Sequence, residues 1–296
     1  MDLGVLRIFI DVARRGGFSP VARDRDLDPS SVSRTIAVLE AELGVRLFQR
    51  TTRRLTLTEA GGLYFDRIEA LVDHLDAARD DALAISTGPL GTLRLTASVA
   101  FGQACLMPLL PAFRQAFPAL KLELLLSDAN LDLVAERIDL AVRLGQSVEA
   151  DVVGVKLFDT HYKVCASPGY IAAAPPLMAP EDLGHHRCLR FTLPEFRTRW
   201  LFSRCGGETR EIPVDGDIII SNALALRDCA LAGLGPALLA DWLIDKDLAA
   251  GTLVDCFPDH QAAATRFNTA AWLLYPSRAF LPNKARVMID FLRQRL

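Results

Sequence analysis

The chain has 296 residues, of which 51% are hydrophobic and 23% charged, and its formal net charge is −3. This composition is typical of a globular protein with enough apolar side chains for two or three domains. With so small a net charge, the overall electrostatic field of the protein does not attract it to nucleic acid or membranes. Any surface that binds anions must therefore be a local cluster of basic residues. Because only five of the 33 basic residues are lysines, local positive charge comes mainly from arginine, whose planar guanidinium can bind phosphates with two hydrogen bonds.

The N-terminal segment "MDLGVLRIFIDVARR" has neither a basic region before its apolar run nor a small-residue cleavage site, so we do not expect a signal peptide. No uncharged apolar run reaches the ~18 residues of a membrane helix. The six cysteines form no C-x-x-C pair. We expect a cytoplasmic protein whose cysteines are small buried apolar residues, with no metal and no cofactor.

The first 58 residues predict a helix-turn-helix. Apolar residues recur at helical spacing from Leu3 to Ala13, and "RGGF" then ends the first helix. A second helix is expected to begin at Ser19 as N-cap, with Pro20 in its first turn, and to end at Leu27. Asp28 and Pro29 repeat this start signal for a third helix, which ends at Gly44 and buries one face, made of Val32, Ile36, Leu39 and Leu43.

The outward side of this third helix carries short hydrogen-bonding groups and one guanidinium. With its apolar face turned inward, the first two turns present Ser30, Ser31, Ser33, Arg34 and Thr35. Hydroxyls and arginine suit phosphates and base edges, and a helix N-terminus adds positive charge. A solvated surface next to an N-cap cluster would explain the same residues taken alone.

The segment "LFQRTTRRLTLT" alternates and predicts a short β-ribbon, a wing, that ends at Thr58 as the next N-cap. No acidic residue interrupts the stretch between Glu42 and Glu59, which contains Arg46, Arg50, Arg53 and Arg54. A ribbon with clustered arginines beside such a helix favours contact with a DNA backbone or minor groove, and we assign that role to Arg50, Arg53 and Arg54.

A long helix is expected from Glu59 to about Ile85, before the hinge "STGPLG". Its apolar residues have a period of 3.5 over nearly three heptads and predict dimerisation through Tyr64, Ile68, Leu71, Leu75, Ala78 and Ala82. Packing of this stripe on its own domain is the alternative.

The remaining residues alternate between strand and helix patterns, which predicts an α/β fold with largely parallel sheets. Expected strands include "TLRLTA", "ALKLELLL", "DLAVRL", "YKVCAS", "DIIIS", "GPALLA" and "TAAWLLY". Expected helices include "ACLMPLLPAFRQAF", "NLDLVAERI", "NALALRDCALAG" and "PNKARVMIDFLRQRL". About 205 residues fit two small subdomains.

The segment "ARDRDLDPSSVSRTIAVLEAELGVRLFQRTTRRLTLTEAG" resembles the DNA-binding region of the LysR-type transcriptional regulators. Further along, "DLAVRLG", "VCASPGY", "EDLGHHRCL" and "LAGLGPALLADWL" resemble the effector-binding domain of that family. Arg25 stands at a position that is usually apolar, and Pro29-Ser30 replaces a common Gln-Pro. Ser33 and Arg34 match the motif, so the resemblance assigns DNA contact to them.

The resemblance implies an α+β multidomain protein. Its parts would be a winged helix-turn-helix (1–58), a linker and dimerisation helix (59–87), and a two-lobed α/β domain similar to periplasmic binding proteins (88–296). The lobes would comprise about 91–164 plus 268–296, and 165–267, with crossovers near Cys165 and Phe267. Dimers or tetramers are implied. A small effector between the lobes would contact Thr96, Ser98, Phe101, Arg143, Gly145, Thr192, Ser221, Asn222, Gly235 and Pro236.

No enzyme motif supports catalysis: the chain lacks a G-x-S-x-G elbow, an H-E-x-x-H pair, a P-loop and a dinucleotide fingerprint. We therefore predict a DNA-binding transcriptional regulator, not an enzyme, that binds double-stranded DNA and a small effector, and has no membrane partner. An organic acid or an aromatic compound would fit the mainly small and neutral pocket residues. The alternative function is a cytoplasmic solute-binding protein whose N-terminal domain serves only assembly.

Overall fold

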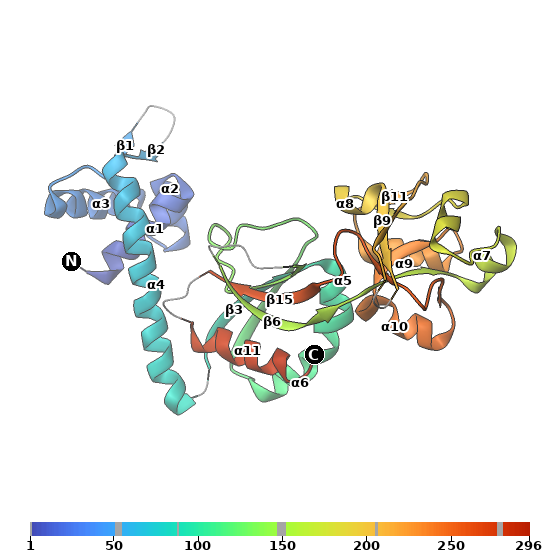
Figure 1. Ribbon diagram of the computed structural model, residues 1–296. Coiled ribbons are helices and arrows are strands. Elements are labelled where there is room, and N and C mark those ends of the chain that lie inside the picture. The colour runs from blue at the N-terminus through green and yellow to red at the C-terminus, as the bar shows by residue number, and fades with distance from the viewer. Residues whose placement is uncertain (1, 51–54, 88, 147–151, 205–206, 277–280) are drawn as a thin grey trace. The chain divides into compact units, whose positions relative to one another are not determined.

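A computed structural model describes residues 2–50, 55–87, 89–146, 152–204, 207–276 and 281–296. The chain folds into two compact units, Met1–Ser86 and Thr87–Leu296 (Figure 1).

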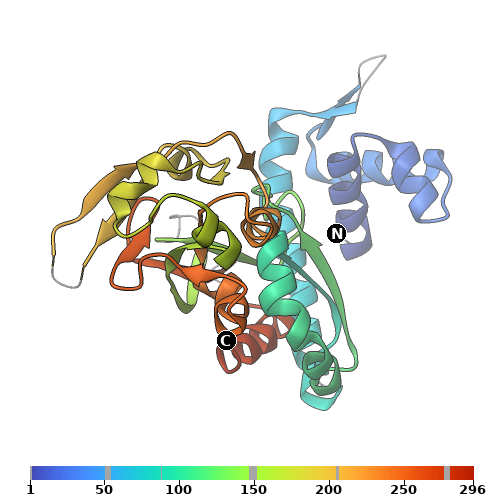
Figure 2. The ribbon, with the colours of Figure 1, turned by 90° about the vertical axis from the view of Figure 1, so that its right-hand side faces the viewer.

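The first unit begins with three short helices, α1 (Leu3–Arg15), α2 (Phe18–Asp24) and α3 (Pro29–Leu43). The bounds of α3 are those expected from the sequence, with Asp28 at the N-cap position and Gly44 at the C-cap in the left-handed conformation (φ 70°). The expected inward face is confirmed, since Val32, Ile36 and Leu39 are fully buried with Phe9, Val12 and Val21 of the other two helices. In both views these helices lie beside the N-terminal part of one long helix (Figures 1 and 2).

The prediction that Ser19 caps the second helix is wrong. The N-cap is Gly17, and α2 begins at Phe18, whose ring packs on Phe48 with centroids 6.3 Å apart. Including Phe18 in the helix places this ring on the core. The helix ends at Asp24 and not at Leu27, and the unusual Arg25 lies at its C-cap, where Nε and Nη2 donate to the Asp11 carboxylate at 3.1 and 2.6 Å. Arg25 therefore joins α2 to α1 from the surface and needs no place in the core.

The wing and the long helix follow in the expected order. Strands β1 (Phe48–Arg50) and β2 (Leu55–Leu57) pair antiparallel, with Phe48 opposite Leu57. Helix α4 spans Glu59–Thr87. Thr58 caps it as expected, because its Oγ1 accepts a hydrogen bond from Gly61 N at 3.0 Å.

The second unit contains two lobes, each built on one main sheet. In the first lobe the strand order is β4-β3-β5-β15-β6. The strands are β3 (Gly91–Ala97), β4 (Leu120–Leu126), β5 (Leu140–Gly145), β6 (Val153–Thr160) and β15 (Thr269–Tyr275). Strand β3 is parallel to β4 and β5, whereas β15 is antiparallel to β5 and β6.

One face of this sheet is covered by α6 (Leu110–Ala116) and α11 (Asn283–Arg293), which bury Phe113 and Met288 against Leu93 and Leu95 (Figure 1). Before α6 the chain forms a helical run of α5 (Val99–Phe101), a π-helix (Gly102–Leu106) and a 3₁₀ turn (Met107–Leu109). The helix expected over "NLDLVAERI" is absent from this described segment, which forms hydrogen-bonded turns. Asp132 Oδ1 accepts from Val134 N and Ala135 N, and Arg137 adopts a positive φ of 52°, which stops helix growth.

The second lobe has the strand order β10-β9-β14-β7-β12, with β13 also paired to β7. Its strands are β7 (Tyr162–Ala166), β9 (Arg199–Ser203), β10 (Arg210–Pro213), β12 (Ala237–Ala240), β13 (Val254–Asp255) and β14 (Gln261–Ala263), beside the short pair β8 (Arg190–Phe191) and β11 (Ile219–Ile220). Its helices are α7 (Pro168–Ala173), α8 (Pro194–Arg197), α9 (Ala223–Leu231) and α10 (Asp241–Ala250), with a 3₁₀ turn at Pro180–His185. Every pairing in the main sheet is antiparallel, so the prediction of largely parallel sheets is wrong for this lobe.

Two crossovers join the lobes, one between β6 and β7 and one between β14 and β15. Thr160 and Thr269 lie at these crossovers and clasp each other: Thr160 Oγ1 donates to Thr269 Oγ1 at 2.8 Å, and Thr269 Oγ1 donates to Thr160 O at 2.9 Å. Strand β7 begins three residues before Cys165, so the first crossover lies slightly earlier than expected.

Candidate functional site

The outward face of α3 presents the groups expected from the sequence. Ser30, Ser31 and Arg34 are exposed, and Ser33 and Thr35 are half-buried. The Arg34 guanidinium makes no hydrogen bond or ion pair with any described residue, so it is available to a ligand. Thr35 differs, because its Oγ1 donates to Ser31 O at 3.0 Å within the helix. The most available groups are therefore two serines and one arginine.

The base of the wing is fixed to α3 by a residue that the sequence analysis missed. The Glu40 carboxylate accepts hydrogen bonds from Leu47 N at 2.7 Å and Phe48 N at 3.0 Å. These amides begin strand β1, so Glu40 sets where the wing leaves the helix. A carboxylate on the half-buried side of an otherwise apolar helix face was the only available sequence signal.

The wing also contacts the first turn of α4 closely. A Cβ added at Gly61 would lie 2.8 Å from the Leu47 carbonyl carbon and closer still to its oxygen. That oxygen already accepts a hydrogen bond from Thr58 N at 2.9 Å. Glycine is required here because the wing backbone occupies the place of a side chain. Of the predicted wing arginines, Arg50 ends β1, but its side chain, like all of Arg53 and Arg54, lies outside the described residues.

The predicted dimerisation stripe of α4 divides into two parts. Tyr64 and Ile68 pack in the core of their own unit, so their assignment to a dimer interface is wrong: Ile68 is 9% exposed, and Tyr64 lies 5.4 Å from the Phe9 ring. Leu71 and Leu75 are 55% and 58% exposed, Leu63 is 62% exposed, and Ala78 is also exposed. The side chain of Ala82 lies outside the described residues. An apolar face therefore remains uncovered along the middle of α4.

Several residues expected to contact an effector are instead structural. Thr96 is fully buried, and its hydroxyl donates to Leu125 O at 2.7 Å. Phe101 is 1% exposed and packs on Phe158 and Trp242, so it is core. Gly235 and Pro236 are buried inside the second lobe, where the Pro236 carbonyl accepts from Leu189 N at 2.8 Å. These four assignments are wrong because the positions fill sheet and core interiors.

Ser98 and Asn222 serve as helix caps at the junction of the lobes. Ser98 Oγ accepts from Phe101 N at 3.2 Å, and Asn222 Oδ1 accepts from Ala225 N at 3.0 Å. Across the junction, Asn222 Nδ2 donates to Asp128 Oδ2 at 2.7 Å, while Asp128 Oδ1 accepts from Val99 N at 3.1 Å. This polar clasp links α9 of one lobe to α5 of the other. Ser221 and Thr192 are exposed nearby, at the ends of the β11 and β8 strands.

Arg143 on β5 does not pair with Asp139, because that carboxylate binds Lys284 Nζ at 2.7 Å and Arg94 N at 2.8 Å. Its Nη2 is buried without a hydrogen-bond partner among the described residues, and burial lowers the pKa of the guanidinium. Trp272 lies opposite Arg143 on the neighbouring strand. Arg143 remains a candidate for anion binding on this face of the sheet.

A pocket of about 330 Å³ lies between the two lobes at the crossovers. From the first lobe it is lined by Leu144, Gly145, Gln146 and Thr269, and from the second by Tyr162, Glu195, Phe196, Ala264, Thr265 and Arg266. Gly145 is thus the only predicted effector residue that lines this particular pocket. Gln146 Nε2 and Thr265 Oγ1 approach to 3.5 Å across it. Leu144, Tyr162 and Thr269 lie on strands that the sequence predicted, but it did not indicate that they face a pocket. The remaining lining residues lie in α8 and in segments between predicted elements.

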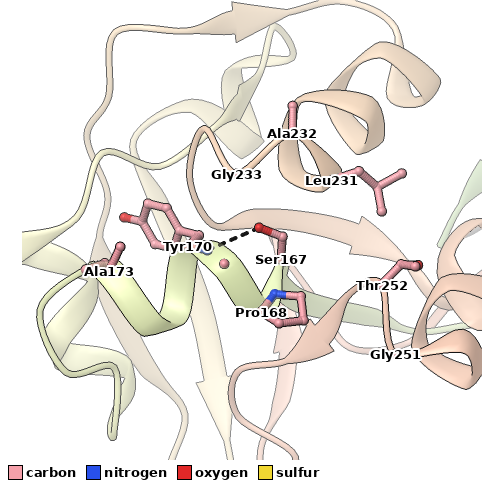
Figure 3. A pocket seen from close by; sticks show the side chains of 11 residues that line it. Ser167, Pro168, Tyr170, Ala173, Leu231, Ala232, Gly233, Gly251 and Thr252 are labelled. Atoms are coloured by element: carbon pink, nitrogen blue, oxygen red, sulfur yellow. Dashed lines mark hydrogen bonds between the residues drawn. The ribbon is translucent and has the colours of Figure 1, made fainter.

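A second, more open hollow of about 700 Å³ lies within the second lobe, between α7 and the C-terminal ends of α9 and α10 (Figure 3). None of its eleven lining residues is charged. The Ser167 hydroxyl that faces it already accepts from Tyr170 N at 3.2 Å. This hollow therefore offers no charged side chain to orient a ligand.

Across the described ranges, no three His, Cys, Asp or Glu side chains gather closely enough to hold a metal ion. The described helices likewise include none that is long and apolar enough to cross a membrane.

A winged helix-turn-helix followed by a two-lobed domain with a pocket between its lobes defines a class of ligand-responsive DNA-binding proteins. Residues 3–62 match the model of the bacterial regulatory helix-turn-helix proteins of the lysR family, and residues 86–296 match the LysR substrate binding domain. The chain belongs to the LysR family of transcriptional regulators.

Transcriptional regulators from bacteria are similar in sequence to this chain over nearly its whole length. The HTH-type transcriptional regulator CrgA of Neisseria meningitidis is 33% identical over 98% of this chain and 96% of its own length. PtxR of Pseudomonas aeruginosa, also an HTH-type transcriptional regulator, is 33% identical over 100% and 93%. The solved structure of CrgA superposes with a TM-score of 0.62 at 31% identity, covering 99% of this chain and 98% of the CrgA chain. These matches support the predicted function as a DNA-binding transcriptional regulator over the alternative of a solute-binding protein.

Proposed function

We propose that the protein recognises DNA through the N-terminal tip of α3 and through its wing, with Ser30, Ser31, Ser33 and Arg34 in the major groove. The supporting observation is the combination of an inward-locked apolar face with an exposed arginine that has no partner among the described residues. A helix held in this way presents the same side chains to every operator half-site. Arg50, Arg53 and Arg54 belong to this proposal as backbone or minor-groove contacts.

Replacing Arg34 with alanine tests this proposal. If Arg34 reads a base, specific binding weakens by about 1–3 kcal/mol and the preference at one base position is lost. Binding is measured by gel shift and footprinting on the DNA upstream of the protein's own gene, at fixed salt. Arg199→Ala, which removes an exposed arginine of the second unit, is the control. Unchanged affinity and sequence preference in Arg34→Ala would contradict the proposal.

We propose that a small effector binds in the pocket between the lobes and shifts the equilibrium between lobe arrangements. The pocket is lined by residues of both lobes, so a ligand there contacts both lobes at once. Gly145 gives a specific test, because a Cβ at this position meets no atom within 4 Å. Gly145→Leu should fill the pocket, leave the strand intact, and abolish effector response while DNA binding is retained.

The exposed face of α4, formed by Leu63, Leu71, Leu75 and Ala78, supports a homodimer through this helix, with a tetramer as the higher form. Burial of about 25 cal/mol per Å² of apolar surface favours such pairing. Replacing Leu71 and Leu75 with glutamate is expected to yield monomers in analytical ultracentrifugation. Because its target is DNA, we place the protein in the cytoplasm and assign it no catalytic activity.

A further inference from the structure

The pocket between the lobes carries one cation and one anion without a partner in the part of the chain that the structure describes. Arg266 and Glu195 both line it, and neither forms an ion pair or hydrogen bond with a described residue. Several other charged side chains of the same lobe are paired, namely Lys163 with Asp255 at 2.7 Å, Arg210 with Glu181 at 2.9 Å, and Arg199 with Glu211 at 3.0 Å. Two exposed opposite charges therefore line the same pocket and are available to a ligand that enters it.

Neutral hydrogen-bonding groups complete the polar part of the pocket. The contact between Gln146 Nε2 and Thr265 Oγ1 is 3.5 Å, long enough that a ligand can replace it at little cost. The Tyr162 hydroxyl has no partner among the described residues. Its pKa is raised to about 12, first by burial and then by the nearby Asp241 carboxylate, so the phenol stays protonated and can donate.

The remaining wall is apolar and aromatic. Phe196 and Tyr162 stack edge to face with ring centroids 5.6 Å apart and an angle of 62°. Leu144, which lines the pocket from the first lobe, is 36% exposed although it lies in strand β5. An apolar ligand group placed here would remove this exposed surface from water.

We propose that the effector is a zwitterion of the amino-acid type with an apolar side group, its carboxylate bound by Arg266, its ammonium group by Glu195, and its side group packed on Phe196 and Leu144. This inference rests on the proposed effector role of the pocket and specifies its ligand. A guanidinium pairs with a carboxylate through two charge-assisted hydrogen bonds. A ligand with only a carboxylate would place like charges together at Glu195, and a ligand with only an amine would do so at Arg266.

The test uses the full-length protein and thermal shift with each standard L-amino acid. For every amino acid that raises the melting temperature, its des-amino acid and its decarboxylated amine are measured by calorimetry; for phenylalanine these are 3-phenylpropanoate and 2-phenylethylamine. We expect each single-charge analogue to bind at least about tenfold more weakly than the amino acid, a difference of about 1.4 kcal/mol. Arg266→Gln and Glu195→Gln should each weaken amino-acid binding to a similar degree. Arg199→Gln and Glu211→Gln, which remove a matched surface pair outside the pocket, should leave it unchanged.

The inference is overturned if no amino acid shifts the melting temperature, if an analogue with one charge binds as tightly, or if the two pocket variants bind normally. Gly145→Leu separates this failure from failure of the proposed function. When metabolites of another class stabilise the wild-type protein but not Gly145→Leu, the pocket is the effector site and its ligand is not a zwitterion. When ligands stabilise both proteins equally, the pocket is not the effector site and both proposals are wrong.

Discussion

Adding one methyl group at Gly61 should displace the wing, whereas the same change at the next residue should stabilise the protein. Both glycines lie in the first turn of α4, where alanine is favoured over glycine by about 1 kcal/mol. At Gly62 a Cβ meets nothing within 4 Å, so Gly62→Ala should gain this helix preference in full. At Gly61 the Cβ meets the Leu47 carbonyl, which is backbone and cannot rotate away. Overpacking of this kind costs about 1–3 kcal/mol.

Moving the Leu47 carbonyl also disturbs its hydrogen bond from Thr58 N, at about 1 kcal/mol for a typical bond. We therefore expect Gly61→Ala to be destabilised by about 2 kcal/mol, and the two variants to differ by about 3 kcal/mol. All three tryptophans (Trp200, Trp242 and Trp272) belong to the second unit, so tryptophan fluorescence follows that unit alone. Far-UV circular dichroism, which also reports the helices of the first unit, should show an earlier urea transition for Gly61→Ala, with unchanged tryptophan fluorescence. Equal or higher stability of Gly61→Ala relative to Gly62→Ala would refute the reasoning.

The remaining predictions concern the wing anchor, the lobe clasp and the buried thiols. Glu40→Ala leaves Leu47 N and Phe48 N without their acceptor, so DNA affinity should fall in gel shifts while Glu42→Ala, an exposed neighbour, has little effect; equal loss in both variants would argue against an anchoring role. Asn222→Ala removes the bond to Asp128 and should increase interlobe opening, seen as faster amide exchange at Val99, whose N–H donates to Asp128 and not to Asn222; protection of Val99 equal to that of the wild type would contradict the clasp. Burial raises the pKa of Cys105, Cys188 and Cys256 to about 12, so iodoacetamide at pH 8 should modify them in urea but not in the native protein, as mapped by mass spectrometry. Because these thiols ionise near pH 9 when unfolded, their contribution to stability is complete below pH 9 and is lost as the pH rises toward 12, which a series of urea titrations across this range would detect.

The sequence by itself determined the elements whose signals are local. The N-cap and C-cap residues of α3, the inward stripe of Val32, Ile36 and Leu39, the alternation of the wing and the cap at Thr58 all depend on neighbours a few residues away, and each was found where expected. The match of motifs along the chain likewise placed it in its family. Arg34 was found for the same reason, since a helix with a known inward face also has a known outward face.

Only the tertiary structure decided features that depend on distant segments. A heptad pattern does not show whether Tyr64 and Ile68 face a partner helix or the core of their own unit, because burying an apolar side chain is favourable in both places. The Thr96 hydroxyl and the Asn222 amide could each bind a ligand. In the structure, however, Thr96 donates to a backbone carbonyl of the sheet, and Asn222 donates to the carboxylate of Asp128. The charged members of the pocket are Glu195, in the single-turn helix α8, and Arg266, in an irregular segment. They are some 70 residues apart, and no periodicity of the sequence indicates that they meet. Hydrogen-bond competition and loop packing are set by the whole fold, which is why the sequence alone could indicate a regulator but not the residues that meet its effector.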